Sequence, residues 1–437
     1  MARGERYVVL GLAHVRSEWF RQVGRWATSA ALPLEFVKVL SVEELRARLG
    51  SGRALSAVLV DSGLPGVDRD LLETARLVGC AVIVVDSGRV ERDWAALGAN
   101  AVLPVGFDRG DLHDALGAVA TVIGRGEAVA LGEVAPPPSS GWRGRLVAVT
   151  GPGGAGSSTV AMALAQGLGA DPRYAGLVLL ADLALDADQA MLHDVGDVVP
   201  GIQEVVEAHR GGQPSIQDLR GLAFALADRP YALLLGLRRH RDWVGIRPRA
   251  FEASLDGLRR CYQAVVADVT GDVEGEDECG SLDVEERNVM ARTTVRNADA
   301  VVLVANSGPR GLHRLVRLIA SALDHGVVTD RIVPVINRAP RSPRGRAEIT
   351  AALAKLARPL TTGGAPLGPP VQLPDRRRLD EVLRDGVPLP GALAAPVTAA
   401  VEHVLSRRAA SVPLPTEPSA IQPGSLGSFY DQQVRRA

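Results

Sequence analysis

One stretch near the middle of the chain limits the fold more than any other. Residues 146–149 form a short apolar run, and a glycine-rich segment at 151–156 follows it. The next residues are small and favour a helix. Gly153, Gly154 and Gly156 lack Cβ atoms, so backbone amides can surround an anion there, and the N-terminus of the helix adds positive potential. The stretch therefore predicts a strand, a phosphate-binding loop and a helix within an α/β fold.

This loop resembles the P-loop of the MinD/ParA group of ATPases, which reads roughly K-G-G-x-G-K-[ST]-T. The matching residues here are Pro152-Gly153-Gly154-Ala155-Gly156-Ser157-Ser158-Thr159. The glycines and the last two hydroxyl residues fit, but Pro152 stands at the signature lysine and Ser157 at the phosphate-binding lysine. The resemblance implies a weakened site for ATP or ADP with Mg²⁺, formed by residues 153–159, with Ser158 as the metal ligand. A glycine turn without a ligand is the alternative.

Three further polar residues match landmarks of the same group. Asp182, Asp268 and Asn337 each close or follow a short apolar run. The resemblance implies that Asp182 positions Mg²⁺ and the attacking water, that Asp268 holds a Mg²⁺-bound water, and that Asn337 contacts the nucleotide base. A purely structural role remains open for each of the three. The alternative for Asp182 is a helix cap, and the alternative for Asn337 is a satisfied strand end. Arg310 is a conceivable substitute for a missing lysine, but nothing in the sequence places it at the phosphates.

The surrounding residues 144–408 are expected to form one doubly wound parallel-sheet domain. Beyond the loop, strands are expected at 177–182, 264–268, 300–304, 331–336 and 369–375, and helices at 201–208, 215–226, 311–323 and 394–408. An acid-rich segment at 272–286 is interpreted as a solvated loop. A basic cluster spans Arg238-Arg239-His240-Arg241 with Arg247 and Arg249. Such a cluster is more typical of a solvated face than of a DNA-binding site.

Residues 1–125 are expected to form a second doubly wound domain. Strands are expected at 6–12, 34–39, 57–61, 81–85 and 101–103, and helices at 17–30, 41–49, 70–78, 90–97 and 108–123. Ser41 and Glu44 have the spacing of a capping box. Strict alternation of strands and helices predicts a parallel sheet that is covered on both faces.

This region resembles the receiver domain of response regulators. Asp61-Ser62-Gly63-Leu64-Pro65-Gly66 is similar to the phosphoacceptor turn, and residues 98–107 are similar to the last-strand motif. Phosphorylation in the family needs an acidic pair after the first strand and a lysine near the fifth. Gly11 and Leu12 occupy the first region and Val105 replaces the lysine. We therefore expect a degenerate receiver in which Asp61 is a turn or cap residue and is not phosphorylated.

Two segments fall outside these domains. Residues 126–143 contain Pro136-Pro137-Pro138-Ser139-Ser140-Gly141 and are interpreted as a linker. Residues 409–437 are rich in proline and serine and are interpreted as a disordered tail.

The net charge of −1 gives no overall bias towards nucleic acid or anionic membranes. No apolar run reaches the ~18 residues of a spanning helix, and the three cysteines have no metal spacing. These observations indicate a cytoplasmic protein that reaches a membrane only indirectly.

The order of the two domains narrows the resemblance. A degenerate receiver followed by a MinD/ParA-like domain, with the late stretch Pro374-Asp375-Arg376-Arg377-Arg378-Leu379-Asp380-Glu381, is similar to the CpaE/TadZ group. That resemblance implies a homodimer that localises pilus-secretion or septum-site machinery through protein partners, at a pole, at the septum or at the inner face of the membrane. Since Pro152 cannot replace the signature lysine, dimerisation is expected to be independent of ATP. An active MinD-type ATPase and a ParA-like DNA partition protein are the alternatives.

Overall fold

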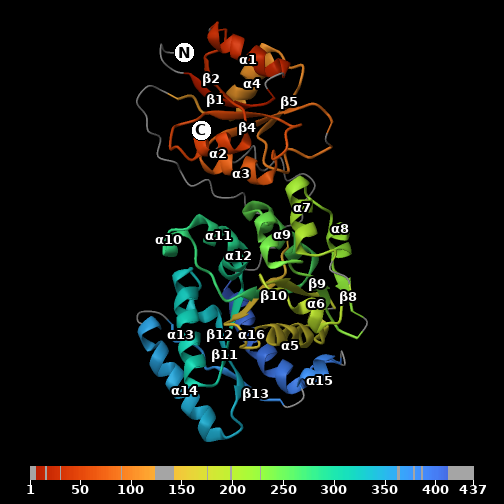
Figure 1. Ribbon diagram of the computed structural model, residues 1–437, viewed down its shortest axis with the longest axis vertical. Coiled ribbons are helices and arrows are strands. Elements are labelled where there is room, and N and C mark those ends of the chain that lie inside the picture. Colours follow the sequence, from red (N-terminus) through yellow and green to blue (C-terminus); the bar gives the residue numbers. More distant parts are fainter. Residues whose placement is uncertain are drawn as a thin grey trace, which may run out of the picture.

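The computed structural model contains two α/β lobes arranged one above the other (Figure 1). The structure describes residues 6–411 except 15–16, 30, 90, 124–141, 175, 197–198, 227, 362–364, 377–378 and 385–386. Most of the expected linker and nearly all of the expected tail therefore lie outside the described residues. Within the described ranges, no helix combines the length and the apolar character needed to cross a membrane.

The first lobe is a five-stranded parallel sheet with the order β2-β1-β3-β4-β5. The strands are β1 (Tyr7–Leu12), β2 (Leu34–Val39), β3 (Ala57–Asp61), β4 (Ala81–Asp86) and β5 (Ala101–Pro104). The helices are α1 (Glu18–Thr28), α2 (Val42–Leu49), α3 (Arg69–Leu77) and α4 (Arg109–Val119). Apolar side chains are buried on both faces of the sheet, as the continuous apolar strands predict. The order is that of flavodoxin-like doubly wound folds.

Local signals explain most of these boundaries. The Ser41 hydroxyl accepts a hydrogen bond from the Glu44 amide at 3.1 Å, while the Glu44 carboxylate accepts one from the Leu40 amide at 3.0 Å. The predicted helix at 90–97 is wrong: the described residues 91–97 contain no helix. Trp94 and Leu97 bury their side chains from a series of turns. Their spacing of three residues fits a helix, but here the two buried side chains hold turns against the core.

The second lobe contains an eight-stranded sheet with the order β13-β12-β11-β6-β10-β7-β9-β8. All its neighbouring strands are parallel except the edge pair β8 and β9. The strands are β6 (Arg145–Gly151), β7 (Val178–Leu183), β8 (Phe224–Ala225), β9 (Ala232–Leu234), β10 (Ala264–Thr270), β11 (Ala300–Asn306), β12 (Ile332–Ala339) and β13 (Val371–Pro374). Both lobes thus confirm the predicted α/β class with parallel sheets.

Helices cover both faces of this sheet and separate two apolar cores. The helices α7 (Ile202–Gly211), α8 (Ile216–Gly221), α9 (Pro248–Cys261), α12 (Val289–Asn297), α13 (Pro309–Asp324) and α14 (Pro343–Ala357) pack on one core. The other core holds α5 (Ser157–Gly169), α6 (Gln189–Leu192), α15 (Leu379–Arg384) and α16 (Gly391–Ser411). Short 3₁₀ helices lie at Pro172–Tyr174, His240–Gly245, Thr329–Arg331 and Arg358–Thr361.

Two expectations for this lobe are wrong. The acid-rich segment 272–286 is not a plain loop, because it contains α10 (Glu276–Cys279) and most of α11 (Leu282–Arg287). Arginines neutralise several of its acids: Arg287 pairs with Asp272, and Arg292 with Glu278. The expected helix at 215–226 stops at Gly221, and its last residues form the edge strand β8.

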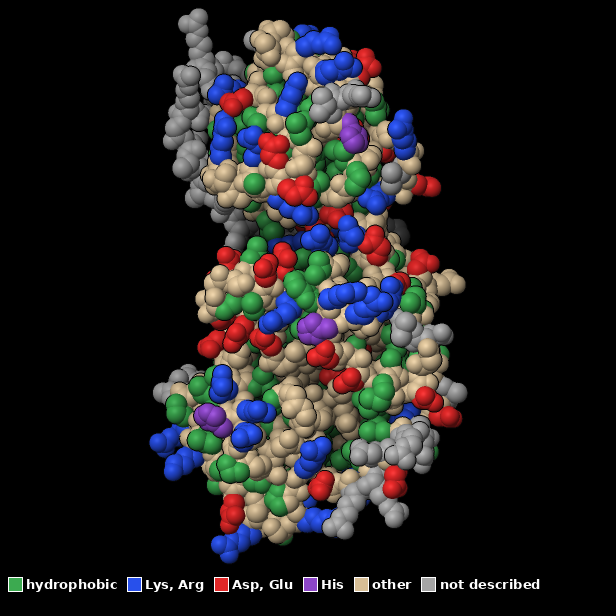
Figure 2. Space-filling model, viewed as in Figure 1, with side chains coloured by type: hydrophobic (Ala, Val, Ile, Leu, Met, Phe, Trp, Pro, Cys, Tyr) green, Lys and Arg blue, Asp and Glu red, His purple; other side chains and the backbone are tan. Residues whose placement is uncertain are grey.

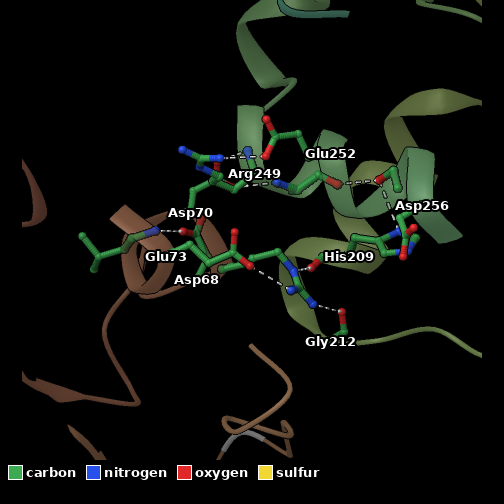
Figure 3. A network of polar contacts seen from close by, with 12 residues as sticks. Asp68, Asp70, Glu73, His209, Gly212, Arg249, Glu252 and Asp256 are labelled. Atoms are coloured by element: carbon green, nitrogen blue, oxygen red, sulfur yellow. Dashed lines mark hydrogen bonds and ion pairs between the residues drawn. The ribbon is translucent and has the colours of Figure 1, made fainter. Parts of the chain in front are cut away.

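A polar interface joins the two lobes where α3 meets α7 and α9 (Figure 3). Asp70 is 5% exposed, and its carboxylate accepts hydrogen bonds from the amides of Arg249 at 2.9 Å and Ala250 at 3.3 Å. These are first-turn amides of α9, whose own N-cap residue makes no side-chain cap. Asp70 therefore caps a helix of the other lobe. Burial raises the pKa of its carboxyl group.

Charged side chains reinforce this interface on either side of Asp70. Arg210 Nη2 lies 2.9 Å from Asp68 Oδ2. Arg69 donates to the carbonyl oxygens of His209 at 3.0 Å and Gly212 at 3.2 Å. Because these groups are held by hydrogen bonds across the interface, the two lobes have a defined relative orientation.

Candidate functional site

The glycine-rich segment forms a tight loop between β6 and α5. Gly154 and Gly156 have φ angles of 76° and 86°, a region in which only glycine is unstrained. A Cβ atom on Gly156 would lie 2.5 Å from Nδ2 of Asn337, so a side chain there would also displace a neighbour. The loop then enters α5, a helix of 13 residues with Gly156 at its N-cap. The sequence thus places an amide-rich loop at a helix N-terminus, as an anion site requires.

Two asparagines from neighbouring strands hold this loop in place. Asn337 Nδ2 donates to the Ala155 carbonyl at 2.8 Å, and Asn306 Nδ2 donates to the Gly154 carbonyl at 3.3 Å. The Asn337 Oδ1 atom accepts a hydrogen bond from the Arg338 amide at 2.9 Å. Asn337 therefore satisfies the end of its strand and braces the loop, which is the structural alternative for this residue. Sequence reasoning missed Asn306.

Asp182 and Asp268 lie directly opposite each other on the paired strands β7 and β10. Both are buried, at 0% and 2% exposure. Gln189 connects them. Its backbone amide nitrogen donates to Asp182 Oδ2 at 2.9 Å, and its side-chain Nε2 atom donates to Asp268 Oδ2 at 2.8 Å. Gln189 Nε2 also reaches the carbonyl of Ser158 at 3.1 Å, which ties both acids to the loop. The sequence contains no signal for this role of Gln189.

Burial controls the protonation of these two acids. It raises the pKa of Asp268 to about 6, against the hydrogen bonds that Asp268 receives from Gln189 and Ser158. It also raises the pKa of Asp182 well above the ordinary value, with a further contribution from the nearby Asp268 carboxylate. A cation beside the pair would stabilise the ionised forms that burial disfavours.

Two cavities flank the first turn of α5, and both are lined by Gly156 and Thr159. The larger has a volume of about 800 Å³ and includes Gly153, Gly154, Ser157, Ser158 and Asp268 in its wall. The smaller has a volume of about 370 Å³ and is lined by Asn337 and by the late stretch at Pro374, Asp375 and Arg376. These volumes are in the range of small-molecule sites.

The cavities bring together most of the residues predicted from the sequence. Ala155 and Asp182 are exceptions, since they lie behind the walls and are almost completely buried. Asn337 faces the smaller cavity, whereas Ser158 and Asp268 face the larger one. The glycine-rich loop therefore lies between the two cavities.

The positive charge in the larger cavity comes from arginines that the sequence analysis did not single out. Neither of the two lysines of the chain, Lys38 and Lys355, belongs to its wall. Arg314 and Arg317 line it instead. They lie three residues apart on α13 and thus on one face of that helix. Arg310, the substitute considered from the sequence, is not among the lining residues.

The described residues offer a limited set of metal ligands. They contain no group of three or more His, Cys, Asp or Glu side chains placed to hold a metal ion. Ser158 and Asp268 line the same cavity, and the Ser158 side chain lowers the pKa of Asp268, so a hydroxyl and a carboxylate lie near each other at the loop. Mg²⁺ commonly takes one or two such protein ligands and completes its shell with phosphate oxygens and water. These residues therefore fit Mg²⁺ that arrives with a nucleotide, rather than a resident ion.

Comparisons with known proteins give only distant matches. A scan against protein-family models finds no match, and a search of curated proteins finds no significant one. Solved structures with a similar fold include a ParA family ATPase from Chlorobium tepidum, with 16% identity and a TM-score of 0.46 over 60% of this chain and 98% of that one. The septum site-determining protein MinD from Pyrococcus horikoshii, complexed with Mg-ADP, has 18% identity and a TM-score of 0.42 over 62% and 99%. Cyanothece McdA, in complex with ATP, has 18% identity and a TM-score of 0.43 over 63% and 100%. At these scores the likeness does not identify a function, which has to be argued from the site itself.

Proposed function

We propose that this protein is a nucleotide-binding spatial regulator of the MinD/ParA type with weak or absent ATP hydrolysis. The observation that carries this proposal is the loop at 152–156, which keeps left-handed glycines and a helix N-terminus but has no lysine. Backbone amides remain to bind a phosphate chain, with Ser158 and Asp268 beside them for Mg²⁺. The smaller cavity, lined by Asn337, would receive the base.

Catalysis depends on the missing charges more than binding does. Phosphoryl transfer relies on positive charge placed where negative charge shifts in the transition state. Pro152 and Ser157 supply none at the two lysine positions. Binding without efficient turnover is therefore the expected behaviour, with Asp182 too deeply buried to contact substrate without rearrangement.

The biological role extends the sequence resemblance. The arrangement of a degenerate receiver before a MinD/ParA-like domain supports a CpaE/TadZ-like protein that localises pilus-secretion or septum-site machinery. Its first lobe would act as a docking module, and the chain would form a homodimer without ATP. Sedimentation with and without Mg-ATP tests this last point, and a monomer that dimerises only with ATP would contradict it.

Calorimetric titration of the full chain with Mg-ATP and Mg-ADP tests the central proposal. We expect weak saturable binding that Ser158→Ala reduces about tenfold or more, because a hydrogen bond to a charged group is worth about 1.5–3 kcal/mol. The matched control, Ser157→Ala, should bind like the unmodified chain. Phosphate release under saturating Mg-ATP should be negligible. Absence of binding to either nucleotide would refute the proposal.

An active ATPase is the second candidate, and Arg314 and Arg317 are the observation that favours it. If they reach the γ-phosphate, they could replace the missing lysines. Turnover that disappears in both Arg314→Ala and Arg317→Ala, with nucleotide binding retained, would establish this alternative. A DNA partition role has less support, because two arginines of the basic cluster form ion pairs within the chain. Arg238 pairs with Glu204, and Arg249 pairs with Glu252.

A further inference from the structure

A third cavity lies beside the interface between the two lobes, away from the nucleotide site. It has a volume of about 330 Å³. One side is formed by the first lobe, through the ends of β1 and β2, the start of α2 and the turn after β3, and the other by Arg210 and Arg247 of the second lobe. No residue of this wall belongs to the two cavities that flank α5. Figure 2 shows basic and acidic side chains gathered at the waist between the lobes.

The position of this cavity is one at which doubly wound sheets bind ligands. Leu12 ends β1, Leu40 follows β2, and residues 64–66 follow β3. In the order β2-β1-β3-β4-β5 the chain changes direction at β1 and β3, and ligands bind outside the carboxyl ends of the strands at such a point. The phosphoacceptor-like turn therefore forms part of a binding cavity without Asp61 itself lining it.

Three arginines from three different elements line this cavity. Arg210 is paired with Asp68 and Glu207. Arg46 and Arg247 are half-buried, and neither side chain makes an ion pair or a hydrogen bond with the described part of the chain. Arg247 does lower the pKa of Asp70 through space. The acids of the wall are Glu43 and Asp68, while Glu207 and Asp70, which act on Arg210 and Arg247, lie outside the wall.

We propose that this cavity binds a small phosphate-bearing ligand, held between Arg46 of the first lobe and Arg247 of the second. Guanidinium groups present forked donors that match phosphate oxygens, and partial burial strengthens each contact. Because the ligand touches both lobes, its binding stabilises their docked arrangement.

Hydrogen exchange on the full chain tests the proposal, with inorganic pyrophosphate as the probe and sodium chloride at matched ionic strength as the reference. We expect pyrophosphate to slow exchange in segments 40–49, 64–72 and 245–252. Exchange at 151–160 reports any binding at the glycine-rich loop separately. The half-saturating concentration at the interface should rise at least tenfold in Arg46→Ala and in Arg247→Ala.

Arg48→Ala is the matched control, because Arg48 lies on the same helix, pairs with Glu44 at 2.8 Å and is absent from the cavity wall. It should respond to pyrophosphate like the unmodified chain. Thermal unfolding without the probe checks that each variant is folded. Absence of protection at the interface segments in the unmodified chain would overturn the proposal, and so would equal protection in the Arg46 and Arg247 variants.

Discussion

Each lobe places an aspartate at the carboxyl end of a central strand, yet the two acids have different surroundings. Asp61 ends β3 and is partly exposed, and its carboxylate accepts hydrogen bonds from Trp19 Nε1 at 3.3 Å and from the Gly63 amide at 3.0 Å. Asp268 lies within β10, is 2% exposed and shares Gln189 with a second buried acid. One carboxylate therefore stabilises a turn, and the other is held beside a phosphate-sized loop.

This difference shows that position in a fold does not determine the chemistry of an acid. What distinguishes Asp268 is the neighbouring Ser158 and a site open to an anion. Asp61 instead has Gly11 and Leu12 in the region where an acidic pair would be needed to hold a metal ion.

Gly156→Val should abolish measurable nucleotide binding. The substitution forces a β-branched residue into a left-handed conformation, and its Cβ atom would lie 2.5 Å from Asn337 Nδ2. Calorimetry with Mg-ADP is the measurement, and Gly221→Ala is the control, since Gly221 lies outside both cavities and a Cβ atom there meets nothing within 4 Å. Unchanged affinity in Gly156→Val would show that the loop does not bind nucleotide.

Stability should fall as pH rises from about 4 to about 6. Asp268 keeps its proton in the folded chain up to about pH 6, whereas the unfolded chain loses it near its ordinary value of 3.8. The folded state then binds more protons, so the free energy of unfolding decreases over this window, by about 3 kcal/mol for this group. Asp182 acts in the same direction.

Urea unfolding at several pH values measures this effect, with Asp268→Asn as the comparison. The variant should lose the part of the pH dependence between 4 and 6 that Asp268 contributes and keep the part that comes from Asp182, while Asp61→Asn should keep both. Equal slopes in Asp268→Asn and the unmodified chain would show that burial does not raise the pKa of Asp268.

Ser157→Lys should strengthen nucleotide binding about ten- to hundredfold. The new ammonium group would stand at the position of the phosphate-binding lysine and add a charge-assisted hydrogen bond worth about 1.5–3 kcal/mol. Titration with Mg-ATP measures the gain. Ser157→Met, which has a long side chain without charge, is the control, and an equal gain in both variants would rule out the electrostatic explanation.

Asp61 should show the smallest response. Incubation of the full chain with acetyl phosphate and Mg²⁺ should add no phosphoryl group to Asp61, as measured by peptide mass spectrometry. Asp61→Asn should lower stability by about 1 kcal/mol or less, because the exposed turn keeps most of its hydrogen bonds. A phosphoryl mass at Asp61 would show that this aspartate is reactive and does not only stabilise a turn.

The sequence predicted the layers of the fold better than its connections. Strands β2 and β3 have the predicted bounds, and in β3 the reason is a continuous apolar run, which is typical of a buried parallel strand. The segment 90–97 failed because Trp94 and Leu97 have helical spacing, while the Asp93 side chain accepts a hydrogen bond from the Ala96 amide at 3.0 Å and holds a turn.

The candidate site carries a signal of its own in the sequence only at the loop, while Asp268 and Asn337 were expected through the family resemblance. The loop at 152–159 carries its own signal in glycine and hydroxyl spacing. Gln189, Arg314 and Arg317 do not, because their contribution depends on how separate elements meet at the edge of the sheet. No pattern within one element reports such a meeting.

Asp70 has a consequence for modularity. The first turn of α9 takes its cap from the other lobe, and α9 leads directly into β10, the strand of Asp268. Although the sequence separates two domains, the start of α9 in the second lobe is stabilised by Asp70 of the first. A chain in which the first lobe is exchanged for another would keep this helix start only if it brought a carboxylate to the same place. Any exchange of the first lobe therefore has to preserve the contact between a carboxylate and the first turn of α9.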